Sequence, residues 1–185
     1  MANKNVVKEV FKVAIILFVI TAIAAAILAA VNKVTAPVIA ENDKKAQEEA
    51  MREVLPEATL FGNMEISVNE NSSVSEVYLS DAGYAVKVAP NGYGGPISMI
   101  VGVDNELKVT GIKIISQSET AGLGAKCLEA SFQEQYKGKT ENITVSKNGA
   151  KDNEIDAISS ATVTSKAGTK GVNEAIEVVK EVKED

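Results

Sequence analysis

An uncharged run of nineteen residues, Val13 to Val31, constrains this chain more than any other feature, and Thr21 is its only polar residue. At about 1.5 Å per residue, a helix of this length is roughly 28 Å long, close to the hydrocarbon thickness of a bilayer. A buried core helix rarely runs so far without a polar face, and the apolar part of a cleaved signal peptide is shorter. We therefore predict a transmembrane helix over residues 13–31.

The lysines around this run are unevenly placed. Lys4, Lys8 and Lys12 precede it, whereas only Lys33 follows it closely. Because positive charge is enriched on the cytoplasmic side of a membrane, this asymmetry predicts a cytoplasmic segment over residues 1–12. The chain would then cross the cell membrane once, with its C-terminal part on the extracytoplasmic side.

The composition excludes several classes of function. The 185 residues include no histidine and one cysteine, so imidazole catalysis, an intrachain disulfide and a cysteine-held iron–sulfur cluster are excluded. The chain has 19 Lys plus Arg and 25 Asp plus Glu, so its formal net charge is −6, and an acidic chain does not suit binding to nucleic acid. A single apolar helix without an ionisable residue cannot conduct ions by itself. We predict no metal site and no complete catalytic site in this chain alone.

The rest of the chain predicts a stalk and one α+β domain. Strong helix formers between Pro37 and Pro56 predict a stalk helix within residues 32–56, with Pro37 at its start. In the domain, residues 57–185, alternating apolar residues predict strands over 77–115, including an antiparallel hairpin turning at Asn105. Short helical and extended stretches follow at 131–138 and 141–148. The apolar spacing over 165–182 predicts a C-terminal helix. This irregular order of helices and antiparallel strands is typical of the α+β class.

Three segments carry residues suited to a ligand. The first, Asn91 to Pro96, has three glycines in four residues, which let a backbone approach a partner closely, although a hairpin turn has the same composition. The second, Ser118 to Gly124, mixes two glycines with hydroxyl and carboxylate side chains at the end of a predicted strand. An ordinary connection between two elements is the alternative there.

The third segment, Asp156 to Ser165, has five hydroxyl side chains in its last seven residues, directly before the C-terminal helix. Thr164 or Ser165 could cap that helix, but capping needs only one hydroxyl. A helix N-terminus with hydroxyls and with Lys166 beside it suits a phosphate group.

The third segment resembles the flavinylation motif Asp-x-x-Ser/Thr-Gly-Ala-Thr of the covalent FMN-binding domains, in which the threonine oxygen is esterified to the FMN phosphate. The resemblance implies that Thr162 is that threonine, although chemistry alone leaves Ser159 and Ser160 open. Ser160 stands where the family usually has glycine, and we expect it to be tolerated provided that the backbone there does not require a positive φ. The other matching positions are Asp156, Ser159, Ala161, Thr164 and Ser165.

The other two segments resemble the same family. Residues 118–124 are similar to its Glu-Thr-Pro-Gly-Leu-Gly stretch, with Ala121 in place of proline, and residues 92–97 are similar to its Gly-Tyr-x-Gly-x-Ile segment. The resemblance implies that residues from both segments lie at the flavin: Glu119, Thr120, Leu123, Gly124, Tyr93 and Gly94.

With its single membrane helix and short length, the chain resembles the G-subunit family of Rnf-type ion-translocating electron-transport complexes. This resemblance implies a membrane-anchored electron carrier with one covalent FMN, a redox component of a complex that couples ferredoxin oxidation and NAD reduction to sodium or proton movement. Its partners would be the other membrane and peripheral components of that complex and a magnesium-dependent flavin transferase that recognises Asp156.

Three alternatives stay open. The chain could be the related C subunit of a sodium-translocating NADH:quinone reductase, a stand-alone anchored flavoprotein, or a flavin-free membrane scaffold of the complex.

Cys127, after the second segment, is expected to be a bystander rather than a reactive thiol with a lowered pKa.

Overall fold

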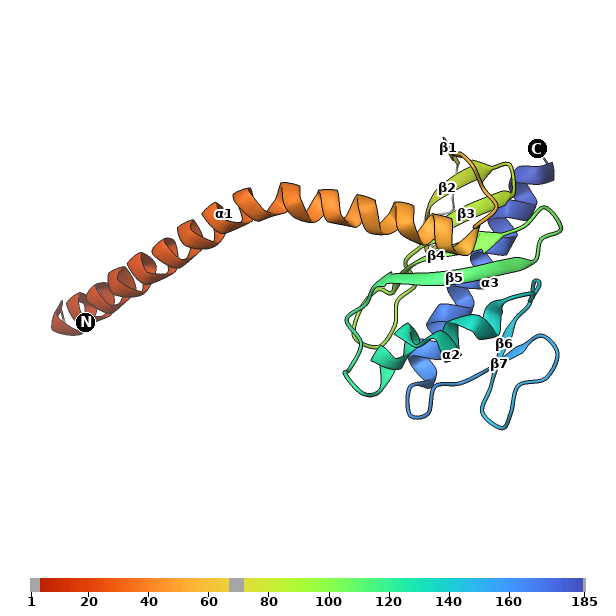
Figure 1. Ribbon diagram of the computed structural model, residues 1–185. Helices are drawn as coiled ribbons and strands as arrows, with labels where there is room; N and C mark the ends of the chain where they lie inside the picture. Colours follow the sequence, from red (N-terminus) through yellow and green to blue (C-terminus); the bar gives the residue numbers. More distant parts are fainter. Residues whose placement is uncertain (1–3, 67–71, 185) are drawn as a thin grey trace. The chain divides into compact units, whose positions relative to one another are not determined.

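The computed structural model describes residues 4–66 and 72–184 and divides into two compact units, Met1–Lys44 and Lys45–Asp185 (Figure 1). Helix α1, Lys4–Val54, contributes to both units. It contains the predicted membrane span and is long and apolar enough to cross a bilayer. From Val10 to Ile39 its large apolar side chains are exposed, which does not fit a buried core helix. The hydroxyl of Thr21 donates to the carbonyls of Leu17 and Phe18, both at 3.0 Å, so its polar group is satisfied within the helix.

The predicted helix start at Pro37 is wrong, because Pro37 lies inside α1. A proline removes one backbone donor and strains the preceding turn, but it does not force an end when both flanks favour helix. The helix ends at Val54, before Pro56, as the sequence predicts. The domain boundaries at residues 12, 31 and 56 stay predictions.

The second unit is built on a five-stranded antiparallel sheet whose strands follow chain order, which confirms the predicted α+β class. The five strands are β1 Phe61–Met64, β2 Val74–Ser80, β3 Gly83–Val88, β4 Ser98–Val103 and β5 Val109–Ser116. The predicted hairpin is present as β4 and β5, which pair antiparallel.

The C-terminal helix α3, Thr162–Glu184, covers one face of this sheet, as Figure 1 shows. Its apolar stripe, which includes Val172, Ile176 and Val179, is fully buried with strand residues in the main core. The other face packs against the end of α1, where Met51 and Val54 join a second core cluster. Both faces of the central strands are therefore buried, which explains their nearly continuous apolar sequence.

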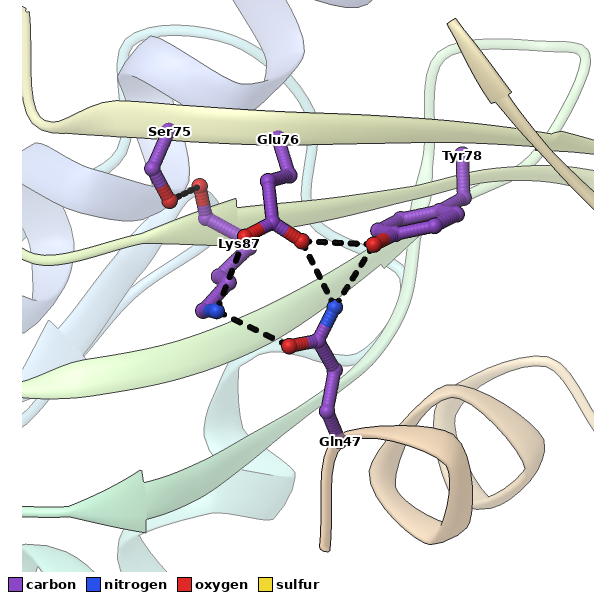
Figure 2. Close-up of polar contacts among 5 residues, drawn as sticks. All are labelled: Gln47, Ser75, Glu76, Tyr78 and Lys87. Carbon is purple, nitrogen blue, oxygen red and sulfur yellow. Dashed lines mark hydrogen bonds and ion pairs between the residues drawn. The ribbon is translucent and has the colours of Figure 1, made fainter. Parts of the chain in front are cut away.

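A polar network joins the end of α1 to β2 and β3 (Figure 2). The amide of Gln47 donates to Glu76 at 2.8 Å and to the Tyr78 hydroxyl at 2.9 Å, and Lys87 donates to Glu76 at 3.0 Å. Burial acts to raise the pKa of Glu76, but hydrogen bonds from Tyr78, Gln47 and Lys87 outweigh it and lower the pKa below 4.5. Burial, together with the hydrogen bond to Glu76, raises the pKa of Tyr78 to about 12.

Short elements connect β5 to α3. The predicted helix at 131–138 is split into two pieces, and the predicted strand at 141–148 is shorter and pairs in parallel with a second short strand. Beneath α3, the buried Tyr136 hydroxyl lies 3.0 Å from Thr169 Oγ1, and burial raises the pKa of Tyr136. The connecting elements are η1 Gly124–Leu128, α2 Ala130–Gln133, η2 Glu134–Tyr136, β6 Thr144–Ser146 and β7 Glu154–Asp156.

Candidate functional site

The three segments singled out from the sequence meet at the carboxylate of Glu119, which is 8% exposed. Its Oε1 accepts hydrogen bonds from the backbone N–H groups of Tyr93 at 2.8 Å and Gly94 at 2.9 Å. Its Oε2 accepts one from the hydroxyl of Thr164 at 2.5 Å. One side chain of the second segment thus ties the first segment to the N-terminal turn of α3. We call this arrangement the Glu119 junction.

Glycine is required where the backbone approaches this carboxylate. A Cβ atom added at Gly92 would lie 2.2 Å from Glu119 Oε1, and one added at Gly124 would lie 2.4 Å from Oε2. Real Cβ atoms do not come so close to an oxygen, so a larger residue at either position would displace the carboxylate. The glycines of two separate segments therefore serve the same contact.

The turn before α3 is held by Ser165. Its hydroxyl accepts from the Ile158 N–H at 2.9 Å and donates to the Ala161 carbonyl at 3.1 Å, while Ala161 N–H donates to the Ile158 carbonyl at 2.9 Å. Because α3 already begins at Thr162, the prediction that Thr164 or Ser165 caps the helix is wrong. Both lie inside its first turn and are buried, and their hydroxyls bond Glu119 and this preceding turn instead.

The three candidate hydroxyls differ in their surroundings. Thr162 is half-buried at the first position of α3, whereas Ser159 and Ser160 are exposed in the turn before it. Ser160 has a φ of +63°, in the left-handed region that favours glycine. We expect serine to be tolerated in place of glycine only if the backbone here does not require a positive φ. The backbone does adopt a positive φ, so this condition is not met. Ala161 is buried.

Asp156 does not join the Glu119 junction. Its exposed carboxylate accepts from the Ala150 N–H at 2.7 Å, and its own N–H donates to Gln135 Oε1 at 2.6 Å. It therefore fixes a neighbouring loop. Sequence reasoning did not point to Gln135 or Ala150, since neither belongs to a recognisable motif.

Exposed apolar side chains adjoin the junction in sequence. Tyr93 is 77% exposed, Leu123 43% and Val163 52%. Thr120 is also exposed, and its carbonyl accepts from the N–H groups of Leu123 at 3.1 Å and of Ala125 at 3.2 Å, which closes the loop. Val163 was not among the predicted site residues, because a single valine inside a hydroxyl-rich segment gives no signal.

Cys127 is buried, and burial followed by the nearby charge of Glu119 raises its pKa to about 11. A lowered pKa is therefore contradicted, and the thiol is not primed for reaction. Within residues 4–66 and 72–184, no group of three or more histidine, cysteine or acidic residues could hold a metal ion.

The chain has clear matches among known proteins. The model of the FMN-binding domain family matches residues 92–177, and that of the RnfG N-terminal region matches residues 1–54. The G subunit of the Na⁺-translocating ferredoxin:NAD⁺ oxidoreductase complex of Acetobacterium woodii is 40% identical, covering 92% of both chains. The G subunit of the proton-translocating complex of Clostridium ljungdahlii is 37% identical, covering 83% of this chain and 82% of that protein.

The fold also matches a solved structure. The C subunit of the Na⁺-translocating NADH-quinone reductase of Parabacteroides distasonis superposes with a TM-score of 0.58 at 20% identity. The match covers 76% of this chain and 92% of that structure, so the two share a fold.

Proposed function

This chain belongs to the family of G subunits of ion-translocating ferredoxin:NAD⁺ oxidoreductase complexes, and from that premise we propose that it carries electrons on an FMN esterified to Thr162. The presence of an FMN-binding domain and membership in an oxidoreductase complex rest on the comparisons. The covalent link, its position and the membrane topology are our proposals.

The observation that carries the proposal is the accessibility of Thr162 at the start of α3, two residues before Thr164, which contacts Glu119. An ester to phosphate needs a hydroxyl that a second enzyme can reach, and Thr162 is half-buried at a helix start rather than enclosed. The hydroxyls of Thr164 and Ser165 are buried and already hydrogen-bonded. Among the threonine and serine hydroxyls of α3's first turn, Thr162 is therefore the accessible one.

The charges of α3 favour a phosphate at its start. A helix dipole ordinarily favours acidic residues in the first turn and basic residues in the last. Here the first charged residues are Lys166 and Lys170, and no acidic residue occurs before Glu174. Lys170 pairs with Glu174 at 3.4 Å, whereas Lys166 stands one helical turn after Thr162. A phosphodiester on Thr162 would add negative charge at this end of the helix, where the helix itself carries no acidic residue and Thr164 contacts the carboxylate of Glu119.

FMN supplies the electron chemistry when bound, and the residues of this chain position it. Thr162 would hold the phosphate, and the Glu119 junction would fix the loops around the ring. The exposed side chains of Tyr93, Leu123 and Val163 would give the ring an apolar surface to cover. The remaining predicted cofactor-binding positions would shape the loops: Asp156, Ser159, Ser160, Ala161, Thr164, Ser165, Thr120, Gly124 and Gly94.

We further propose that residues 1–12 are cytoplasmic, that residues 13–31 span the membrane, and that residues 57–185 lie on the extracytoplasmic side. The lysines before the span support this orientation. A magnesium-dependent flavin transferase would attach FMN, with Asp156 part of what it recognises. A covalent link then keeps the cofactor from diffusing away on the outer side.

The decisive experiment is the intact mass of the full-length protein purified from a host that expresses the flavin transferase, followed by peptide mapping. We expect a gain of one FMN minus one water, localised to Thr162. Thr162→Ala should lack this mass, while the matched controls Ser159→Ala and Ser160→Ala should retain it. An unmodified wild-type mass, with the transferase active on a control protein, would overturn the proposal in favour of a flavin-free scaffold.

A further inference from the structure

The Glu119 carboxylate is a buried negative charge without a cationic partner among the described side chains. Its three hydrogen-bond donors are two backbone N–H groups and the hydroxyl of Thr164. The ion pairs between described side chains do not include Glu119. Burying a carboxylate without a salt bridge requires several good donors, and the glycines at positions 92 and 124 give the backbone room to approach.

These donors suit the ionised form. A backbone N–H can only donate, so Oε1 must accept from both Tyr93 and Gly94. Oε2 accepts from Thr164, and hydrogen bonds into a charged oxygen are stronger than those into a neutral one. The site therefore holds a fixed anion whose field is not cancelled by a described lysine or arginine in contact with it.

This charge lies close to where the flavin would be carried, an inference that rests on the proposed function. Thr164, which contacts the carboxylate directly, is two residues after Thr162 in the same helical turn. The exposed Tyr93 and Leu123 belong to the loops that the carboxylate joins. Only the ribityl chain separates the phosphate of FMN from its ring, so a ring tethered at Thr162 stays near the junction.

We propose that Glu119 lowers the midpoint potential of FMN carried on Thr162, in addition to positioning the loops around it. Reduction adds negative charge to the flavin, and a nearby fixed anion opposes that addition. Burial limits the screening of this charge by water and salt. Glu119 thereby acts as an electrostatic determinant of the potential at which this protein passes electrons.

The test is a spectroelectrochemical titration of the full-length flavinylated protein in detergent. Glu119→Gln keeps the shape and the acceptor for Tyr93 and Gly94 but removes the charge. We expect its reduction equilibrium constant to rise at least tenfold, which is about 59 mV for a one-electron step. The matched control is Glu129→Gln, which neutralises an exposed carboxylate and should change the constant less than threefold. A Glu119→Gln constant within the range of this control would overturn the proposal.

Thr164→Val separates charge from loop packing, because it removes one donor and keeps the anion. With less compensation the anion should oppose reduction more strongly, so the constant should fall, opposite in sign to Glu119→Gln. A rise in both variants would mean that loop disruption sets the potential, and would also overturn the proposal. If Glu119→Gln takes up no flavin, the reduction equilibrium constant of Thr164→Val decides. A fall in this constant supports the proposal, and an unchanged or raised constant overturns it. Failure of the proposed function is distinguishable, since the wild type would then show no FMN mass on Thr162.

Discussion

Glu119 and Glu76 each join segments that are distant in sequence, but they do so with different partners. The side chain of Glu76 is 35% exposed and bonds only other side chains, including the ammonium of Lys87. Glu119 is 8% exposed and bonds two peptide groups and one hydroxyl, with no ion pair among the described side chains. The charge of Glu76 is balanced locally, whereas that of Glu119 is not.

The difference contrasts a carboxylate whose charge is paired with a lysine with one whose proposed role is to act on a bound cofactor. In the Glu76 network, each side chain can turn toward water when a partner is lost, so the loss is limited. At the Glu119 junction, two of the donors are backbone groups held in place by their loop, and the third, the Thr164 hydroxyl, belongs to a residue that is 1% exposed. A surplus of negative charge is useful only where it acts on something else, such as a redox cofactor.

The largest effect should follow Glu119→Ala. This substitution removes the acceptor of three donors, and the one on a buried residue, the Thr164 hydroxyl, costs about 1–3 kcal/mol when it is left unsatisfied. We expect the free energy of unfolding of the full chain in detergent to fall by about 1–3 kcal/mol, measured by denaturant titration with circular dichroism. A loss below that of Glu76→Gln would contradict the contrast between the two carboxylates.

A smaller effect should follow Glu76→Gln. The Glu76 carboxylate is partly exposed, so we expect a loss of up to about 1 kcal/mol at pH 7. Its folded-state pKa is lowered, so its stabilisation is present above the ordinary pKa of 4.5 and is lost as pH falls through the lower folded value. The difference between wild type and Glu76→Gln should therefore shrink below pH 4.5. A difference that stays constant as the pH falls through this range would show that charge is not its origin.

The smallest effect, and the one stabilising change, should be Ser160→Gly. Glycine accepts the φ of +63° without the steric cost that serine carries, so we expect a gain of about 0.5 kcal/mol in the same denaturant titration. Ser159→Gly, outside the positive-φ region, is the matched control and should bring no gain. Equal effects of the two substitutions would show that the turn before α3 is not strained at Ser160.

Much of the fold could be predicted because its signals are local. The alternating apolar residues of β4 and β5, and the helical spacing of α3, are properties of short windows of sequence. The pairing of β6 with β7 could not be predicted, because three-residue strands carry too little pattern. The sequence at Pro37 predicts a helix start where the helix in fact continues, since a proline inside a helix and one at its first turn look alike in sequence.

The site was predicted as three separate segments, and the structure brings them together. The hydrogen bond between Glu119 and Thr164 could not be predicted from the sequence. The two residues are 45 positions apart, and nothing in the sequence around either one indicates its partner. For the same reason, the sequence predicts a helix cap at Thr164 or Ser165, because capping is the commonest local use of such hydroxyls. The positive φ of Ser160 is also set by the surrounding turn rather than by serine itself.

The chain-order arrangement of the sheet has a consequence for how the protein reaches its native state. Neighbouring strands close short loops, as where Ser80 pairs with Gly83, whereas the Glu119 junction closes loops of 25, 26 and 45 residues. Since the entropy cost of closing a loop grows with its length, the sheet can assemble before the junction does. A flavin transferase that requires the finished junction would therefore modify only chains that have completed folding, and the cofactor would mark them as mature.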